Sequence, residues 1–190
     1  MGGAIRDCEA IVDAFWGQPA NSVTALAFVV GGIVVILRSE LVWVGIASIA
    51  TGIGSFLFHG PMPPLSEWVH DFTLAWLLLV VAGVGRPWER WSRLPGMVAV
   101  AAICALPGVA DPFAVVLAAA AVVLLLADDR SSRTIGPMIL LGVAAVLGRL
   151  GATGGPLCDP GALLQPHAIW HLSAATAVTW WATARPGSTR

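Results

Sequence analysis

Long apolar runs alternate along the chain with short segments rich in polar residues, glycine and proline. A helix needs about 20 mainly apolar residues, with a range of about 17–25, to cross the hydrocarbon core of a bilayer. Seven runs come close to this length: Asn21–Leu37, Leu41–His59, Trp68–Gly85, Pro95–Val109, Pro112–Ala127, Thr134–Leu150 and Pro166–Ala184. The pattern predicts an all-α membrane protein, a single domain over residues 1–190 in which seven transmembrane helices form a bundle.

Turn signals separate most of these runs, but the boundary between the fourth and fifth is short. Only Ala110 and Asp111 lie between them, and Pro112 begins the fifth run, so we expect a tight turn made by Asp111 and Pro112. Pro107 and Gly108 also interrupt the fourth run, which makes it the weakest of the seven.

The composition supports a membrane protein. Of the 190 residues 57% are hydrophobic and only 11% are charged, and the mean hydropathy is +0.83. Soluble domains have about 25% charged residues. The chain therefore lacks the polar surface that a water-soluble globule needs.

The arginines predict the orientation of the bundle. All ten basic residues are arginine, and eight of them fall on the side of the C-terminus if there are seven spans: Arg38, Arg86, Arg90, Arg93, Arg130, Arg133, Arg185 and Arg190. Only Arg6 and Arg149 fall on the other side. Because basic residues are enriched in cytoplasmic loops, we expect the N-terminus outside and the C-terminus in the cytoplasm. Residues 1–20 then form an external N-terminal segment, and residues 185–190 form a cytoplasmic tail.

The same topology brings all four histidines to one membrane level near the outer face. His59 ends the second run, His70 begins the third, and His167 and His171 begin the seventh. Residues four apart share one face of a helix, so His167 and His171 point the same way. Ionisable groups within spans are costly in lipid and usually mark function. The convergence of histidines from separate spans predicts a metal site formed by His59, His167 and His171.

Three histidines suit a catalytic zinc ion. Such an ion keeps a fourth position for water and lowers the pKa of that water to about 7. In HExxH enzymes a glutamate between the two histidines is the general base, but the stretch "HAIWH" has Ala168 there. We therefore expect the base to come from elsewhere, and Asp71 is the candidate at the right depth.

Ser55 is a further candidate because it lies four residues before His59 and so on the same face of the helix. Its hydroxyl could hold the oxyanion of a tetrahedral intermediate. The alternative is a structural hydrogen bond to a carbonyl of its own helix, which is common in membrane helices.

Several segments together resemble the alkaline ceramidases. These are "DCE" (7–9), "QPANSVTALAF" (18–28), "GIGSFLFH" (52–59) with a following aspartate, and "CDPGALLQPHAIWH" (158–171). The wider superfamily of seven-span hydrolases includes the progestin and adiponectin receptors and the post-GPI-attachment lipid-remodelling proteins. The resemblance covers the N-terminus, the first three spans and the seventh, whereas the fourth to sixth spans are generic.

The resemblance implies a role for each matching residue. It implies zinc ligands at His59, His167 and His171, an aspartate that assists the zinc water at Asp71, and a serine that stabilises the oxyanion at Ser55. Asp71 lies one residue further from His59 than in the eukaryotic enzymes, and "GPMPPLS" replaces their loop. Glu67 and His70 therefore remain alternatives to Asp71.

The resemblance also implies two features of the N-terminal segment. Eukaryotic alkaline ceramidases bind calcium through acidic residues near the first span, and the corresponding residues here are Asp7, Glu9, Asp13 and Asn21. Gln18 stands where the family usually has glutamate, and the alternative is a solvated acidic segment without calcium. The family pattern also implies a disulfide between Cys8 and Cys158, both on the external side, where disulfides persist. Cys104 is expected within a span, in a packing role.

These expectations lead to a function. The chain is similar to a bacterial alkaline ceramidase of the inner (cytoplasmic) membrane with its site near the external face. It would hydrolyse ceramide or another N-acyl lipid within the bilayer and release a fatty acid by attack of zinc-bound water. No nucleic acid or protein partner is expected. The competing functions are a receptor-like lipid-binding protein with structural zinc and a metal or proton transporter. A transporter needs polar groups across the whole bilayer, and the cytoplasmic halves of the predicted spans have none that ionise.

Overall fold

The computed structural model describes residues 4–185, and all regular structure in that range is helical. A short 3-10 helix, η1 (Ala4–Asp7), is followed by eight α-helices. They are α1 (Pro19–Arg38), α2 (Val42–His59), α3 (Ser66–Gly83), α4 (Glu89–Ser92), α5 (Leu94–Cys104), α6 (Ala110–Asp128), α7 (Ser132–Leu150) and α8 (Pro166–Ala184). The prediction of an all-α protein is confirmed for this part of the chain.

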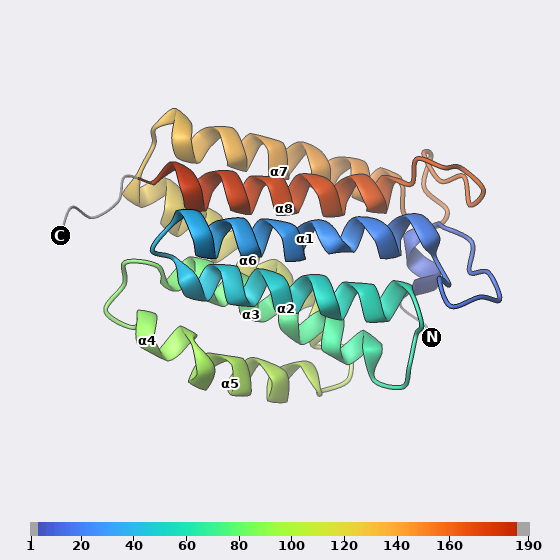
Figure 1. Cartoon of the computed structure of the whole chain (residues 1–190), viewed down its shortest axis with the longest axis horizontal. Coiled ribbons are helices and arrows are strands. Elements are labelled where there is room, and N and C mark those ends of the chain that lie inside the picture. The colour runs from blue at the N-terminus through green and yellow to red at the C-terminus, as the bar shows by residue number, and fades with distance from the viewer. Residues whose placement is uncertain (1–3, 186–190) are drawn as a thin grey trace.

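The helices pack side by side with their axes roughly parallel to the long axis of the molecule (Figure 1). Helix α1 lies between α2 and α8, while α3 lies against α2, α5 and α6, and α7 packs on α8. Helices α1 and α2 approach closely at two glycines, since a Cβ atom on Gly32 would collide with the carbonyl oxygen of Gly45. This close packing places the beginning of α1 beside the end of α2.

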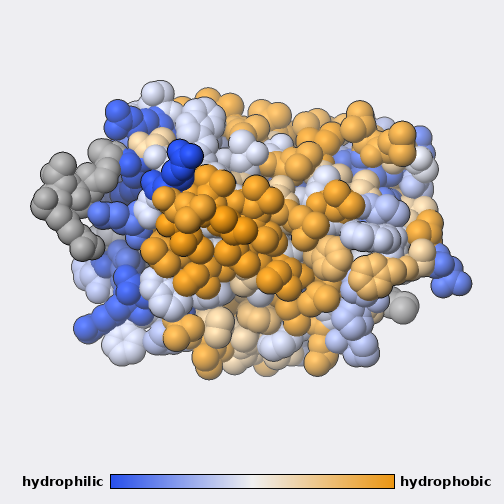
Figure 2. Space-filling view, viewed as in Figure 1, coloured by the Kyte–Doolittle hydropathy of each residue, from blue (hydrophilic) through white to orange (hydrophobic). Residues whose placement is uncertain are grey.

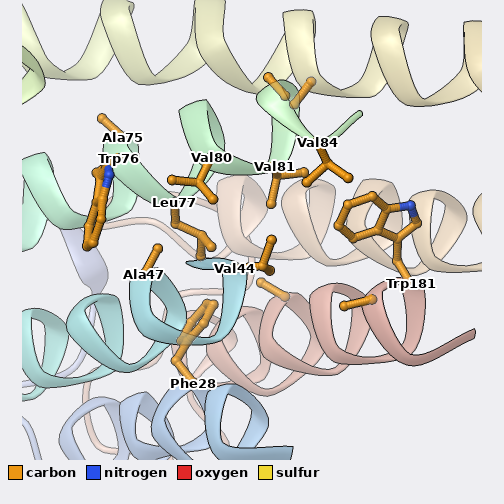
Figure 3. Close-up of a cluster of buried hydrophobic side chains, with 14 of the residues drawn as sticks. Phe28, Val44, Ala47, Ala75, Trp76, Leu77, Val80, Val81, Val84 and Trp181 are labelled. Carbon is orange, nitrogen blue, oxygen red and sulfur yellow. The ribbon is translucent and has the colours of Figure 1, made fainter. Parts of the chain in front are cut away.

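Large apolar side chains from several helices form the interior (Figure 3). Phe28 of α1, Leu77 of α3 and Trp181 of α8 are nearly inaccessible to solvent. Alanines such as Ala47 and Ala75 are also fully buried in this interior. The core occupies the middle of the bundle and leaves its two ends to polar groups.

Four helices are long and apolar enough to cross a membrane: α1, α2, α6 and α7. Many of their apolar side chains face outward, including Val30 on α1 and Val115 and Val123 on α6, which are all more than half exposed. Figure 2 shows an apolar band across the middle of one face, with hydrophilic residues at both ends. An apolar outer surface of this kind is typical of a protein surrounded by lipid.

The fourth run differs from its prediction. The run was expected to span Pro95–Val109, but helix α5 ends at Cys104 and has 11 residues, so it is only about 16 Å long. Gly108 has a positive φ of 72° and Pro107 has no N–H to donate, so these two residues form a turn. The turn expected at Asp111 and Pro112 is wrong, because both lie in the first turn of α6, where proline and an acidic residue are favourable.

The two ends of the bundle differ in charge. The seven described arginines of the predicted cytoplasmic group lie at the end where α1 and α8 finish, and Arg190 is outside the described residues. Arg6, Arg149 and all four histidines lie at the opposite end. The grouping expected from the sequence is therefore present in three dimensions.

Candidate metal centre

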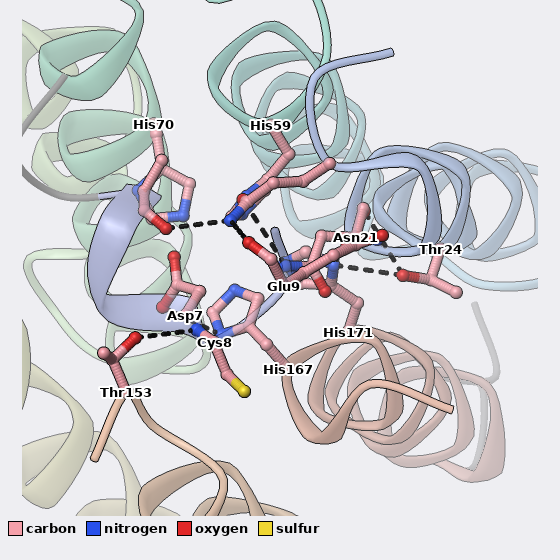
Figure 4. A network of polar contacts seen from close by, with 12 residues as sticks. Asp7, Cys8, Glu9, Asn21, Thr24, His59, His70, Thr153, His167 and His171 are labelled. Atoms are coloured by element: carbon pink, nitrogen blue, oxygen red, sulfur yellow. Dashed lines mark hydrogen bonds and ion pairs between the residues drawn. The ribbon is translucent and has the colours of Figure 1, made fainter. Parts of the chain in front are cut away.

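Three histidines meet where α2 ends and α8 begins. The ring centroids of His59 and His167 are 5.0 Å apart, those of His59 and His171 are 5.2 Å apart, and those of His167 and His171 are 4.5 Å apart. One ring nitrogen from each lies within 4.8 Å of those of the other two. Figure 4 shows the three rings close together, with Asp7 and Glu9 beside them. The predicted convergence of these residues is confirmed.

Each histidine uses its Nδ1 atom to contact a residue between positions 7 and 21. His59 Nδ1 lies 2.6 Å from Gln18 Oε1, and His167 Nδ1 lies 3.3 Å from Asp7 Oδ1. His171 Nδ1 lies 3.1 Å from the main-chain oxygen of Asn21. His171 Nδ1 also lies 3.3 Å from the Thr24 hydroxyl oxygen. Because amide, main-chain and carboxylate oxygens only accept hydrogen bonds, these contacts assign the proton of each histidine to Nδ1.

The remaining ring nitrogens are then free to bind a metal ion. A neutral imidazole protonated at Nδ1 has its lone pair at Nε2. The Nε2 atoms of His59, His167 and His171 are all buried, and none has a hydrogen-bond partner among the described residues. Buried polar atoms without partners are costly and need an explanation. Three such lone pairs in one place can hold a metal ion, and a hydrogen bond from the other nitrogen is typical of histidine ligands.

Local structure explains why the ligands lie here. Pro166 begins α8, where its fixed φ and missing N–H are favourable, so His167 and His171 fall in the first two turns. His59 is the last residue of α2, and its carbonyl oxygen accepts a hydrogen bond from the Gln18 N–H. Glu9 holds the start of α1 because its two carboxylate oxygens accept from the N–H groups of Ala20 and Asn21.

Asp7 is the partner of His167. The sequence suggested Asp7 only as a calcium ligand. It lies in η1, and burial raises its pKa to about 6, while His70 and Arg6 oppose this effect. One of its carboxylate oxygens lies 3.3 Å from His167 Nδ1. No sequence motif signals this contact, because it joins residues 160 positions apart.

A cavity of about 790 Å³ adjoins the centre and reaches His167. Its polar wall contains Asp7, Glu67, His70 and Asp71, so Asp71 and both of its alternatives face the same space. Asp71 accepts a hydrogen bond from His70 at 2.9 Å. Its role as a base stays a prediction, as do the roles of Glu67 and His70.

Ser55 lies one turn below His59 and is buried. Its hydroxyl makes no hydrogen bond to another described residue, whereas the hydroxyl of Thr51 on the same helix donates to main-chain oxygens. The alternative of a structural hydrogen bond to its own helix is therefore not observed for Ser55. The oxyanion role stays a prediction.

The four residues suggested for calcium have different surroundings, and calcium binding stays a prediction. Glu9 is engaged at the start of α1, Asp7 contacts His167, and Asp13 is exposed. Asn21 is buried, and its main-chain oxygen serves His171. Within residues 4–185, the three histidines are the one group of potential ligands that converges.

The structure contains the disulfide between Cys8 and Cys158 that the resemblance implies. It joins the segment after η1 to the loop before α8, across 150 positions of sequence. Cys104 is a buried free cysteine at the end of α5 and also lines the cavity.

Comparisons of the chain with protein-family models, with curated proteins and with solved structures find no match. The resemblance to the alkaline ceramidases therefore depends on the sequence motifs alone, and it stays a prediction.

Proposed function

We propose that the chain is a membrane-embedded, zinc-dependent hydrolase that cleaves the amide bond of ceramide or another N-acyl lipid. The observation that carries this proposal is the set of three buried Nε2 atoms without partners beside a cavity. Three nitrogen ligands are a common set for catalytic zinc. The sequence motifs supply the link to lipid amides.

The membrane arrangement belongs to the same proposal. Seven helices, α1–α3 and α5–α8, cross the bilayer of a bacterial inner membrane, with the N-terminus outside and the C-terminus in the cytoplasm. The distribution of arginine supports this orientation. Helix α5 is too short to span alone, so the segment containing α4 completes this crossing near the cytoplasmic surface. The histidines then lie near the external face.

His59, His167 and His171 would hold the zinc ion. When bound, zinc lowers the pKa of a water molecule to about 7 and polarises the carbonyl group of a substrate. The protein contributes the orientation of these ligands and the cavity beside them.

Asp71 on the cavity wall and the buried Ser55, one turn from His59, supply the other functions that amide hydrolysis needs. Asp71 accepts the proton of the attacking water and delivers it to the nitrogen of the leaving amine. Ser55 donates a hydrogen bond to the carbonyl oxygen as negative charge develops there. The apolar part of the cavity wall, which includes Phe58, Met62 and Trp68, holds the hydrocarbon next to the amide.

Metal analysis combined with a lipid-hydrolysis assay tests the proposal. Purified protein should contain about one zinc ion per chain and release free fatty acid from vesicles that contain N-acyl lipids. His171→Ala removes one ligand, so it should lose most of its zinc and its activity, as measured by elemental analysis and by fatty-acid release. Zinc retained at the wild-type level in this variant would contradict the assigned site.

The receptor-like alternative predicts a different result in the same experiment. A lipid-binding protein with structural zinc would contain the metal but release no fatty acid from any N-acyl lipid. That outcome would replace the hydrolase proposal.

A further inference from the structure

Each of the three histidine ligands has its Nδ1 atom next to a residue from one short part of the chain. Asp7, Gln18 and Asn21 all belong to residues 7–21, whereas the ligands belong to α2 and α8. A short N-terminal stretch therefore orients every ligand of the candidate centre. We call residues 4–21 the N-terminal strap.

Gln18 is the central residue of this strap. Its side chain is fully buried, and its Oε1 atom lies 2.6 Å from His59 Nδ1. Its Nε2 atom donates to the main-chain oxygens of Ala4 and Glu9, both at 2.8 Å. These two bonds fix which atom of the amide is the oxygen, so Gln18 accepts from His59 and thereby directs the His59 lone pair toward the other two histidines.

The strap is attached to the loop before α8 at several points. Cys8 forms the disulfide with Cys158, and its N–H donates to Thr153 Oγ1 at 3.1 Å. The Thr153 N–H donates to the oxygen of Arg6 at 2.9 Å, and the Ala10 N–H donates to the oxygen of Pro160 at 3.1 Å. The disulfide is the covalent member of this set. It holds η1 where Asp7 can reach His167.

We propose that the N-terminal strap is the outer coordination shell of the metal centre, with Gln18 as the positioning residue of His59 and the Cys8–Cys158 disulfide as the clasp that sets metal affinity. This proposal rests on the metal centre of the proposed function, but not on any catalytic activity. Removing an outer-shell partner of a metal ligand typically lowers affinity about 10- to 100-fold. Reduction of the disulfide should affect both the position of Asp7 and the position of the start of α1.

The Gln18 variants test the positioning role through zinc affinity, measured by competition with a chromophoric chelator. Gln18→Leu removes the acceptor of His59 and should lower zinc affinity about 10- to 100-fold. Gln18→Glu keeps an acceptor oxygen and should bind zinc more tightly than Gln18→Leu. The visible absorption of Co²⁺-loaded protein should also change in Gln18→Leu, because this spectrum reports the ligand arrangement.

Thr51→Val is the matched control for loss of a buried polar contact. Thr51 is buried on the same helix as His59, and its hydroxyl donates to the oxygens of Ala47 and Thr73. The variant should lose some thermal stability but keep wild-type zinc affinity and the wild-type Co²⁺ spectrum. An equal loss of affinity in Thr51→Val and Gln18→Leu would overturn the positioning role.

The clasp is tested in wild-type protein that has already folded. A water-soluble phosphine supplies two electrons to the S–S bond and becomes its oxide with oxygen from water, while Cys8 and Cys158 take up two protons and become thiols. Reduction should weaken zinc binding at least about 10-fold. A Cys8→Ala/Cys158→Ala variant should bind zinc as weakly as the reduced protein and should not respond to the phosphine. This control excludes metal binding by the reductant.

The outcomes separate the two proposals. Unchanged affinity in both reduced wild-type protein and Gln18→Leu would overturn the role of the strap and leave the metal centre intact. Wild-type protein that binds no zinc would overturn both.

Discussion

Two aspartates flank the histidine cluster, and the structure gives them different partners. Asp7 lies 3.3 Å from His167 Nδ1 and so belongs with the ligands. Asp71 pairs with His70 on the wall of the cavity, where a substrate can reach it. The two carboxylates are therefore expected to serve different steps, one in holding the metal ion and the other in moving a proton.

Asp71→Asn should separate chemistry from metal binding. Asparagine keeps the shape and the hydrogen-bonding reach of aspartate but is not basic. We expect zinc content and thermal stability close to those of the wild type, together with a loss of at least about 10²-fold in fatty-acid release. The measurements are elemental analysis and the turnover of an N-acyl lipid in detergent micelles.

Glu67→Gln is the control for this experiment, since Glu67 lines the same cavity. Near wild-type turnover in Asp71→Asn would show that Asp71 is not the base. A loss confined to Glu67→Gln would assign the role to that residue instead.

The residues of the site could be predicted from the sequence to an uneven extent. The three histidines could be predicted, because their spacing along one helix and the order of the spans bring them together. Asp7 and Gln18 act through contacts to residues 160 and 41 positions away, and no periodicity encodes such contacts. The one sequence feature that pointed to these contacts was Gln18, because it is neutral at a position where the alkaline ceramidases usually have glutamate.

At the scale of the helices, hydropathy predicted the presence of elements better than their ends. The seventh run coincides with α8 in full, since Pro166 gives a clear start. For the fourth run, the prediction of helix is wrong after Cys104. Ala105, Leu106 and Val109 are apolar whether they lie in a turn or in a helix, so hydropathy does not show where the helix ends. Backbone conformation at Gly108, with its positive φ, decides the boundary, and hydropathy does not report it.

Helix α6 has only two buried residues, Ala121 and Leu125, so the other contacts that hold it should matter for stability. Arg86, just beyond α3, donates to the oxygen of Leu124 at 3.1 Å and to both carboxylate oxygens of Asp128 at 2.8 Å. Replacing it in Arg86→Met removes these bonds while keeping the aliphatic stem. Because the pair is partly exposed, we expect a loss of about 1 kcal/mol and a decrease in Tm of about 2–4 °C.

Thermal unfolding in detergent, followed by circular dichroism, measures this effect. Arg133→Met is the control, because it also removes one arginine at the same end of the bundle but from an exposed site. Surface changes of this kind usually alter stability by less than about 0.5 kcal/mol. Equal decreases in Tm for the two variants would show that the link between α3 and α6 contributes nothing specific.

At the scale of the whole molecule, the two ends of the bundle are chemically distinct. One end has the histidines, the disulfide and the cavity, and the other has seven arginines together with tryptophans such as Trp88 and Trp91. Arginine is enriched on the cytoplasmic side of a membrane, whereas tryptophan is enriched at both boundaries between lipid and water. A disulfide, in contrast, persists in an oxidising compartment. The arginines and the disulfide therefore both support the proposed orientation, in which the histidine end faces outward.

Cysteine labelling in intact cells tests this orientation. In a background with Cys104→Ala, and with the native disulfide retained, a cysteine placed at Gly3 should react with a membrane-impermeant maleimide, because the N-terminus is expected outside. A cysteine placed at Ser188 should react only after the cells are permeabilised, because the arginines are expected to hold the C-terminus in the cytoplasm. The reverse pattern would put the histidine centre on the cytoplasmic side. The Cys8–Cys158 disulfide would then face a reducing compartment, and the strap would be open where the protein works.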